Sequence, residues 1–213
     1  FTELLAKQCA PAEIHGLDPA EAQLDYAQQW AGISGVTFHQ GDAMALPFED
    51  GSFDSAVMAL VIFFVPDPSQ AVAEMARVVQ PGGSVSSYVW DIHGGGSPYE
   101  PIQAEMRAVG MSPLLPPNPD ASRMIALTTL WEASGLEAIQ SHEIKVRRNF
   151  VDFEEFWTTS TSIGSLKPTI SALASKDLVE LKARVQAKLS VADDAPVSLE
   201  ARANAIQGRV PNL

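Results

Sequence analysis

Two short apolar runs near the start of this chain each end in a single aspartate. Residues 12–17 lead into Asp18, residues 36–41 contain Gly41 and lead into Asp42, and a third apolar run follows at 56–65. Short buried strands that end in acids are typical of an open α/β sheet, whose ligands bind just beyond the carboxyl ends of the strands. Carboxylates at those ends accept hydrogen bonds from ribose hydroxyls and from the N–H groups of a base. The pattern therefore predicts a sheet that binds a nucleoside.

Apolar runs then alternate with helical patterns, which favours right-handed crossovers and a mostly parallel sheet. Gly32 is expected to end the helix that begins at residue 19. Asp67 is a suitable N-cap for the helix that begins at residue 68, and Pro81-Gly82-Gly83 is expected to end that same helix. The last strand alternates in polarity, which suits an antiparallel or edge position. We expect strands over residues 12–17, 36–41, 54–61, 84–90, 137–150 and 197–209, and helices over 1–10, 19–30, 68 to 77 or 80, 101–109, 121–133 and most of 152–189.

The net negative charge of this chain disfavours some classes of binding partner. Its 213 residues hold 14 Lys and Arg against 26 Asp and Glu, a formal charge of -12, which repels phosphate backbones and anionic headgroups. We therefore expect a small-molecule substrate and neither nucleic acid nor membrane as a partner. The longest apolar run, of about ten residues, is too short to span a bilayer and no signal peptide is visible, so we expect a cytoplasmic protein. The single cysteine, Cys9, is expected as a packed thiol rather than a nucleophile. The spacing of the four histidines resembles no metal site.

Several stretches of the N-terminal part resemble the class I S-adenosylmethionine-dependent methyltransferases, above all the group that acts on small molecules. They are residues 14–19, 41–48, 50–54, 65–68 and 74–83, the last ending in Pro-Gly-Gly.

The resemblance implies an α/β fold, namely a Rossmann-like, doubly wound, mostly parallel seven-stranded sheet with an antiparallel last strand and an inserted helical lid. It implies S-adenosyl-L-methionine as cofactor and methyl transfer to a small organic substrate by in-line displacement. In one domain of residues 1–213, residues 1–91 would bind the cofactor, and residues 92–135 and 151–196 would lie on the substrate side.

The same resemblance assigns cofactor-binding residues. Asp18 would hold the ribose hydroxyls, and Asp42, with the backbone amide of Ala43, would address the adenine. The remaining contacts would flank the adenine or lie against the methionine part: Pro19, Ala20, Gly41, Met44, Ala59 and Leu60.

Two features depart from the family pattern. The family's first strand, its acid and the glycine-rich turn that meets the amino acid end of the cofactor are missing from this sequence, and we expect that a preceding segment has been omitted. Phe63-Phe64 stands where relatives often carry polar or histidine residues, which predicts a dry wall rather than a base.

The sequence leaves the catalytic groups open. His93 follows the strand expected at 84–90, where substrate should bind, and is either a general base or a loop histidine without a function. Several large side chains either line an apolar substrate pocket or hold the inserted helices to the sheet: Met106, Met111, Phe150, Phe153, Phe156 and Trp157.

Two other functions compete with methyl transfer. Asp18 would serve the ribose of a nicotinamide cofactor equally well, so an oxidoreductase is the first alternative. The second is a catalytically silent binding protein with the same fold, which the Phe63-Phe64 pair and the missing turn permit.

Overall fold

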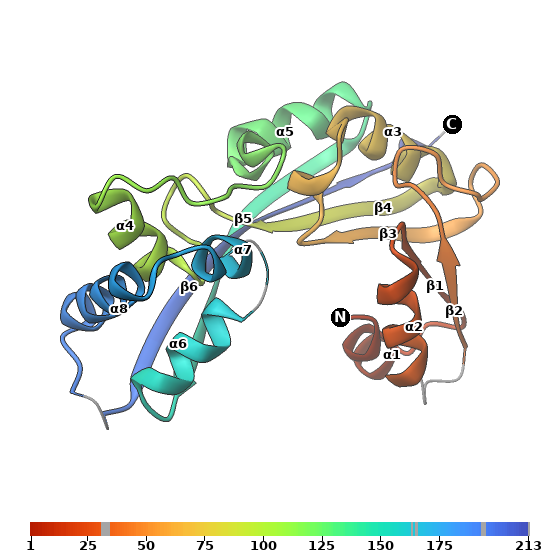
Figure 1. Cartoon of the computed structure of the whole chain (residues 1–213). Helices are drawn as coiled ribbons and strands as arrows, with labels where there is room; N and C mark the ends of the chain where they lie inside the picture. The colour runs from red at the N-terminus through yellow and green to blue at the C-terminus, as the bar shows by residue number, and fades with distance from the viewer. Residues whose placement is uncertain (31–34, 163, 165, 193–194, 213) are drawn as a thin grey trace.

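The computed structural model describes residues 1–30, 35–162, 164, 166–192 and 195–212. Gly32, which the sequence places at the end of a helix, lies outside the described residues. Figure 1 shows long strands crossing the molecule, with a group of helices at one end and a small two-stranded unit at the other.

The larger sheet has four strands in the order β3-β4-β6-β5. Strands β3 and β4 are parallel, whereas β6 is antiparallel to both β4 and β5. The antiparallel last strand is thereby confirmed, although it lies inside the sheet because β5 covers its second edge. The bounds are β3 Phe53–Ala59, β4 Val79–Trp90, β5 Glu137–Phe150 and β6 Val197–Arg209.

The smaller sheet consists of β1 and β2, which are parallel and connected through helix α2. An α/β fold with parallel and antiparallel strands is thus confirmed. The described residues form these six strands in two separate sheets, so the seven-stranded sheet remains a prediction. The elements of this unit are α1 Thr2–Cys9, β1 Ile14–Asp18, α2 Glu21–Trp30 and β2 Val36–Gln40.

Helices α3 (Pro68–Val78) and α5 (Met124–Ala133) cover one face of the larger sheet (Figure 1). Trp131 of α5 is fully buried there, and its Nε1 donates a hydrogen bond to the carbonyl of Val85 in β4 at 3.1 Å. The side chains that form this first core come from both helices and from β3, β4 and β6: they include Met58, Ala71, Val72, Met75, Val85, Val89, Leu127, Trp131 and Ile206.

A second core lies where the far ends of β5 and β6 meet four helices (Figure 1). Phe150, Phe153, Phe156 and Trp157 are buried in it, and so is Met106, whereas Met111 packs against its rim. These side chains therefore hold the inserted helices to the strands. The helices are α4 Glu100–Ala108, α6 Phe153–Thr161, α7 Leu166–Ser171 and α8 Ser175–Leu189.

The predicted insertion at residues 92–135 contains both α4 and α5. Helix α4 packs in the second core, whereas α5 packs in the first core. The division of residues 92–135 and 151–196 from the rest of the domain stays a prediction.

The prediction that Pro81-Gly82-Gly83 stops a helix is wrong. Helix α3 ends at Val78, and β4 begins at Val79, which pairs with Phe53 of β3. The Pro-Gly-Gly run lies within β4 at the register shift between the pairs Phe53–Val79 and Ser55–Ser84, and the amide of Gly82 donates to the carbonyl of Val210 at 2.9 Å. Gly82 has a φ of 77°, a conformation that glycine adopts without the steric cost of a Cβ.

Cys9 is exposed, and the prediction of a packed thiol is wrong. Helix α1 contains no buried residue. Among the described helices, none is long and apolar enough to cross a bilayer.

Candidate functional site

The two predicted aspartates lie at the same edge of the small sheet. The parallel register pairs Asp18 at the end of β1 with Gln40 at the end of β2. The amide of Gly41 donates to the carbonyl of Asp18 at 3.3 Å, which holds the turn before Asp42 beside the first acid. Two carboxylates that are far apart in sequence are thus brought to one end of a strand pair.

Each of these carboxylates uses one oxygen locally. Oδ1 of Asp18 accepts from the amide of Ala20 at 2.8 Å, and Oδ1 of Asp42 accepts from the amide of Met44 at 2.9 Å. Among the described residues, neither Oδ2 has a partner, and the amide of Ala43 has none either. The local capping role therefore leaves an acceptor on each acid, and a backbone donor, available to a ligand.

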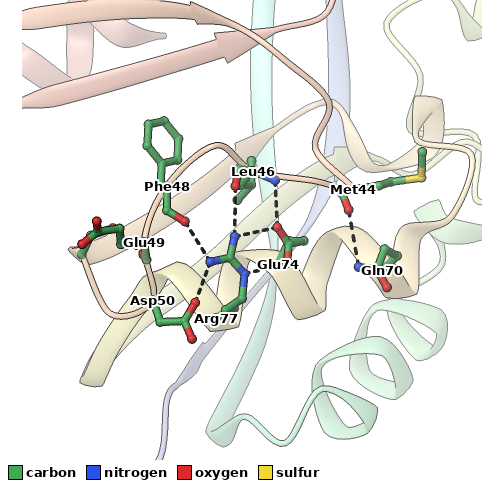
Figure 2. Close-up of polar contacts among 9 residues, drawn as sticks. Met44, Leu46, Phe48, Glu49, Asp50, Gln70, Glu74 and Arg77 are labelled. Carbon is green, nitrogen blue, oxygen red and sulfur yellow. Dashed lines mark hydrogen bonds and ion pairs between the residues drawn. The ribbon is translucent and has the colours of Figure 1, made fainter.

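Helix α3 clamps the loop that carries Asp42 (Figure 2). Nη1 of Arg77 donates to the carbonyl of Phe48 at 2.8 Å and to Asp50 at 2.7 Å, and its Nη2 donates to the carbonyl of Leu46 at 3.0 Å. Nε and Nη2 of the same guanidinium bind Glu74 at 2.7 and 2.8 Å. One planar group thus joins the helix to the loop at several points, which suits the forked geometry of arginine.

Glu74 completes this clamp by accepting from the amide of Leu46 at 2.8 Å, and Gln70 donates to the carbonyl of Met44 at 3.4 Å (Figure 2). Hydrogen bonding from Arg77 holds the pKa of the Glu74 carboxyl below its ordinary value of 4.5. Sequence reasoning did not single out Glu74 and Arg77. The signal that could have found them is an acid and a base three residues apart on a helix, inside the stretch that carries the resemblance.

The Glu74 carboxylate predicts a specific acid sensitivity. Because its pKa is lowered in the folded state, it contributes stability above the ordinary carboxyl pKa and loses that contribution as the pH falls through the lower folded value. We expect Glu74→Gln to remove this part of the pH dependence, measured by urea unfolding between about pH 5.5 and pH 3.5. The exposed Glu49 supplies a control as Glu49→Gln, and equal slopes for both variants would contradict the prediction.

The predicted methionine-side residues end strand β3. Leu60 has a φ of 59°, an uncommon conformation for a residue with a branched side chain, and its amide donates to the carbonyl of Tyr88 at 2.8 Å. Backbone in such conformations clusters at functional sites. The short helix η1 (Ile62–Phe64) follows, in which Phe63 is buried and Phe64 is 56% exposed. Only Phe63 of that pair therefore packs into a dry interior.

An aromatic cluster connects the small sheet to the larger one. His15 of β1 and His39 of β2 stack, with Nδ1 of the first 2.8 Å from Nε2 of the second. Both rings contact Phe48 of the clamped loop edge-on, and His15 also contacts Phe53 of β3 at 5.4 Å between ring centroids. The loop after Asp42 thus lies between the two sheets.

The remaining sequence candidate, His93, lies after the end of β4. Its Nε2 is 3.0 Å from Oδ1 of Asp120. An open surface hollow lies nearby, between the start of α3 and the segment leading into α5, and Asp120 lines it. None of the predicted cofactor residues lines that hollow. The described residues bring together no group of three or more His, Cys, Asp or Glu that could hold a metal ion.

Comparisons with known proteins point to one family for the N-terminal part. Residues 1–87 match the family described as "Methyltransferase domain". The demethylmenaquinone methyltransferase of Staphylococcus aureus is 40% identical over 87 residues, which are 40% of this chain and 36% of that protein. This chain therefore matches about a third of the length of that relative.

Solved structures extend the likeness to the whole chain at the level of fold. The YcgJ protein of Bacillus subtilis superposes with a TM-score of 0.61 and 17% identity, covering 100% of this chain and 88% of that one. A second structure is that of a phosphoethanolamine N-methyltransferase of Haemonchus contortus, solved with S-adenosylhomocysteine and phosphomonomethylethanolamine. It superposes with a TM-score of 0.57 and 17% identity, covering 99% of this chain and 46% of that one.

Proposed function

We propose that this chain is a class I S-adenosylmethionine-dependent methyltransferase and that it transfers a methyl group from S-adenosylmethionine to a small organic acceptor, a proposal supported by the match of residues 1–87 to the methyltransferase domain family. One observation carries the proposal. Asp18 and Asp42 lie at the carboxyl edge of one strand pair, inside the matched segment, and each keeps an unpartnered carboxylate oxygen.

The donors and acceptors at this edge fit an adenosine. Oδ2 of Asp18 can accept from ribose hydroxyls, and Oδ2 of Asp42 can accept from an exocyclic amine. The free amide of Ala43 can donate to a ring nitrogen, with Gly41 shaping the turn before it. The remaining residues proposed here flank the adenine or face the methionine part: Pro19, Ala20, Met44, Ala59 and Leu60.

The sulfonium of the cofactor supplies an activated methyl group. The residues of this chain then have to bind the adenosine, orient the acceptor in line with the methyl carbon and exclude water. The exclusion of water is served by an apolar surface at the end of β3. It is formed by the half-buried Ala59 and Leu60 and the buried Phe63.

The proposal includes the finer features that the family resemblance implies. Parallel β1–β2, parallel β3–β4 and antiparallel β6 support a seven-stranded sheet. The formal charge of -12 supports small molecules over nucleic acid as partners. The cytoplasmic setting remains a prediction from the sequence.

Calorimetric titration with S-adenosylhomocysteine tests the proposal. We expect binding by the unaltered protein and a loss of at least about tenfold in affinity for Asp18→Ala, because hydrogen bonds to a charged group contribute about 1.5–3 kcal/mol. Asp25→Ala, which removes an exposed carboxylate from α2, is the matched control.

Two outcomes of the titration would overturn the proposed function. One is the absence of S-adenosylhomocysteine binding by the unaltered protein. The other is binding of a nicotinamide dinucleotide in its place, which would favour the oxidoreductase alternative.

A further inference from the structure

Two histidines are hydrogen-bonded to each other across the small sheet. His15 of β1 is paired with Thr37 of β2. Two residues further along each strand, Leu17 is paired with His39. Alternate residues of a strand share a face, so the two imidazoles are diagonal neighbours on one face of the sheet. Nδ1 of His15 lies 2.8 Å from Nε2 of His39, and both side chains are half-buried. We call this contact the histidine pair.

The histidine pair lies close behind the proposed adenosine site. Each of its histidines stands three residues before one of the two adenosine-binding aspartates. Both rings also contact Phe48 edge-on, with centroids 5.6 and 5.1 Å apart. Phe48 lies in the loop that begins at Asp42, and its carbonyl accepts from Nη1 of Arg77 at 2.8 Å. The loop is therefore held at Phe48 twice, by Arg77 through the carbonyl and by the histidine pair through the ring.

The hydrogen bond of the histidine pair limits how many protons the two rings can hold. One ring has to donate an N–H, and the other has to accept it with a lone pair. Two neutral rings meet this requirement, and so do one neutral and one cationic ring. In a cationic imidazole both nitrogens carry protons, so two cationic rings would direct N–H groups at each other across 2.8 Å. The bonded pair can therefore take up one extra proton, whereas two separated rings can take up two.

The charges around the pair favour His15 as the site of that one extra proton. Oε2 of Glu13 lies 3.8 Å from Nε2 of His15, the nitrogen that does not face His39. A cationic His15 can thus face Glu13 through one nitrogen and donate to His39 through the other, in a charge-assisted hydrogen bond. Glu13 is 82% exposed, so its attraction is weak.

The charged groups of the neighbouring elements are engaged elsewhere or are exposed. Those with partners are Glu3 with Lys7, Asp18 with the amide of Ala20, Asp42 with the amide of Met44, Asp50 and Glu74 with Arg77, and Asp54 with Gln80. Those that are exposed are Glu21, Asp25 and Glu49. The limit of one extra proton therefore comes from the geometry of the two rings.

We propose that His15 and His39 are positioning residues that make the affinity for the adenosine cofactor sensitive to protons. This inference rests on the proposed function. Imidazoles ordinarily take up protons near pH 6.5, and below that pH the second proton requires the two rings to separate. Separation removes the bond between β1 and β2 behind the acids and the ring contacts that hold Phe48.

The sign of the effect follows from the proton count. The bonded pair holds fewer protons than the separated rings, so acid favours separation and lowers the affinity for the cofactor. Coupling between two sites is reciprocal, so a bound adenosine in turn opposes uptake of the second proton.

Ring titration by NMR tests the pair without any ligand. As the pH falls from about 7.5 to about 5.5, we expect one of the two rings to become cationic while the other stays neutral. Loss of signals in His15→Gln and in His39→Gln assigns the two rings. The second ring should become cationic only together with changes in the amide signals of β1, β2 and Phe48. Two cationic rings beside unchanged amide signals would overturn the proposal.

Calorimetric titration with S-adenosylhomocysteine provides the second test. We expect the affinity of the unaltered protein to be about tenfold lower at about pH 5.5 than at about pH 7.5. At the lower pH, binding should also release protons, measured as a difference in heat between buffers of different ionisation enthalpy.

His39→Gln is the decisive variant, because its amide can still bond to Nδ1 of His15 but takes up no proton. Its affinity should change by less than about twofold between the two pH values, with less proton release. His15→Gln offers the same bond from the other strand and replaces it if His39→Gln does not fold. His142→Gln, which removes an exposed histidine from β5, is the matched control and should keep the full pH dependence.

The outcomes separate this inference from the proposed function. If the unaltered protein binds no S-adenosylhomocysteine at either pH, the proposed function fails and so does the control of cofactor affinity. The ring titration then still decides whether the pair holds one extra proton or two. If the protein binds equally well at both pH values, or if His39→Gln loses as much affinity in acid as the unaltered protein, only the role of the histidine pair is overturned.

Discussion

Replacing Trp131 by alanine is expected to lower the free energy of unfolding by about 3–5 kcal/mol. The side chain is 0% exposed and fills the space between α5 and the larger sheet. Its loss leaves a cavity and also removes the donor to the carbonyl of Val85. Strand β6 approaches so closely here that a Cβ on Gly208 would lie 2.9 Å from the indole. A close-packed site of this kind has little room to collapse into the cavity.

Urea unfolding of Trp131→Ala and of Ile125→Ala provides a matched comparison on one helix. Ile125 is 72% exposed, so its truncation should change the free energy of unfolding by no more than about 0.5 kcal/mol. A Trp131→Ala variant that loses less than about 1 kcal/mol would show that α5 does not anchor the first core.

Replacing Arg77 by alanine is expected to destabilise the fold by about 2–3 kcal/mol and to weaken S-adenosylhomocysteine binding by about tenfold. The stability loss arises because Glu74, only 14% exposed, would keep its charge without its partner. The expected loss of stability is smaller than the loss typical of breaking a fully buried ion pair, because the Arg77 side chain is 31% exposed.

The binding loss has a separate cause. Without the guanidinium, the carbonyls of Leu46 and Phe48 are released, and the loop that carries Asp42 and Met44 has to be ordered by the ligand. Ordering of that kind reduces affinity even when the contact residues are unchanged.

Arg77→Lys is the sharper variant in this series, because it keeps the charge but cannot bind two carbonyls and Glu74 together. We expect it to recover part of the stability and little of the affinity, as measured by urea unfolding and by calorimetry. Arg107→Ala removes a surface pair with Glu100 on α4 and is the control. Equal affinities of Arg77→Ala and the unaltered protein would contradict the positioning role of the clamp.

Local patterns were sufficient to predict most elements of this fold. The strand ends at Asp18 and at Gln40 follow from apolar runs that stop at polar residues, and α2 and α5 follow from helical spacing. The antiparallel setting of β6 follows from its alternating polarity. These features depend on neighbours in sequence, which a single chain displays directly.

The candidate site was predictable only in part. The two acids could be found because each ends a strand, whereas their second role as local caps for Ala20 and Met44 appears only in the folded chain. Arg77 could not be assigned to the site from sequence, since two of its partners are backbone carbonyls that any residue provides.

The sequence by itself determined the order of strands and helices, the acids at the ends of β1 and β2, and the likeness of residues 1–87 to the methyltransferase domain family. Only the tertiary structure decided that Pro81-Gly82-Gly83 joins β4, that Cys9 is exposed and that Asp120 meets His93. The physical reason is the same in each case. Strand pairing, burial and ion pairing depend on partners distant in the chain, and those partners come together only when the whole chain packs.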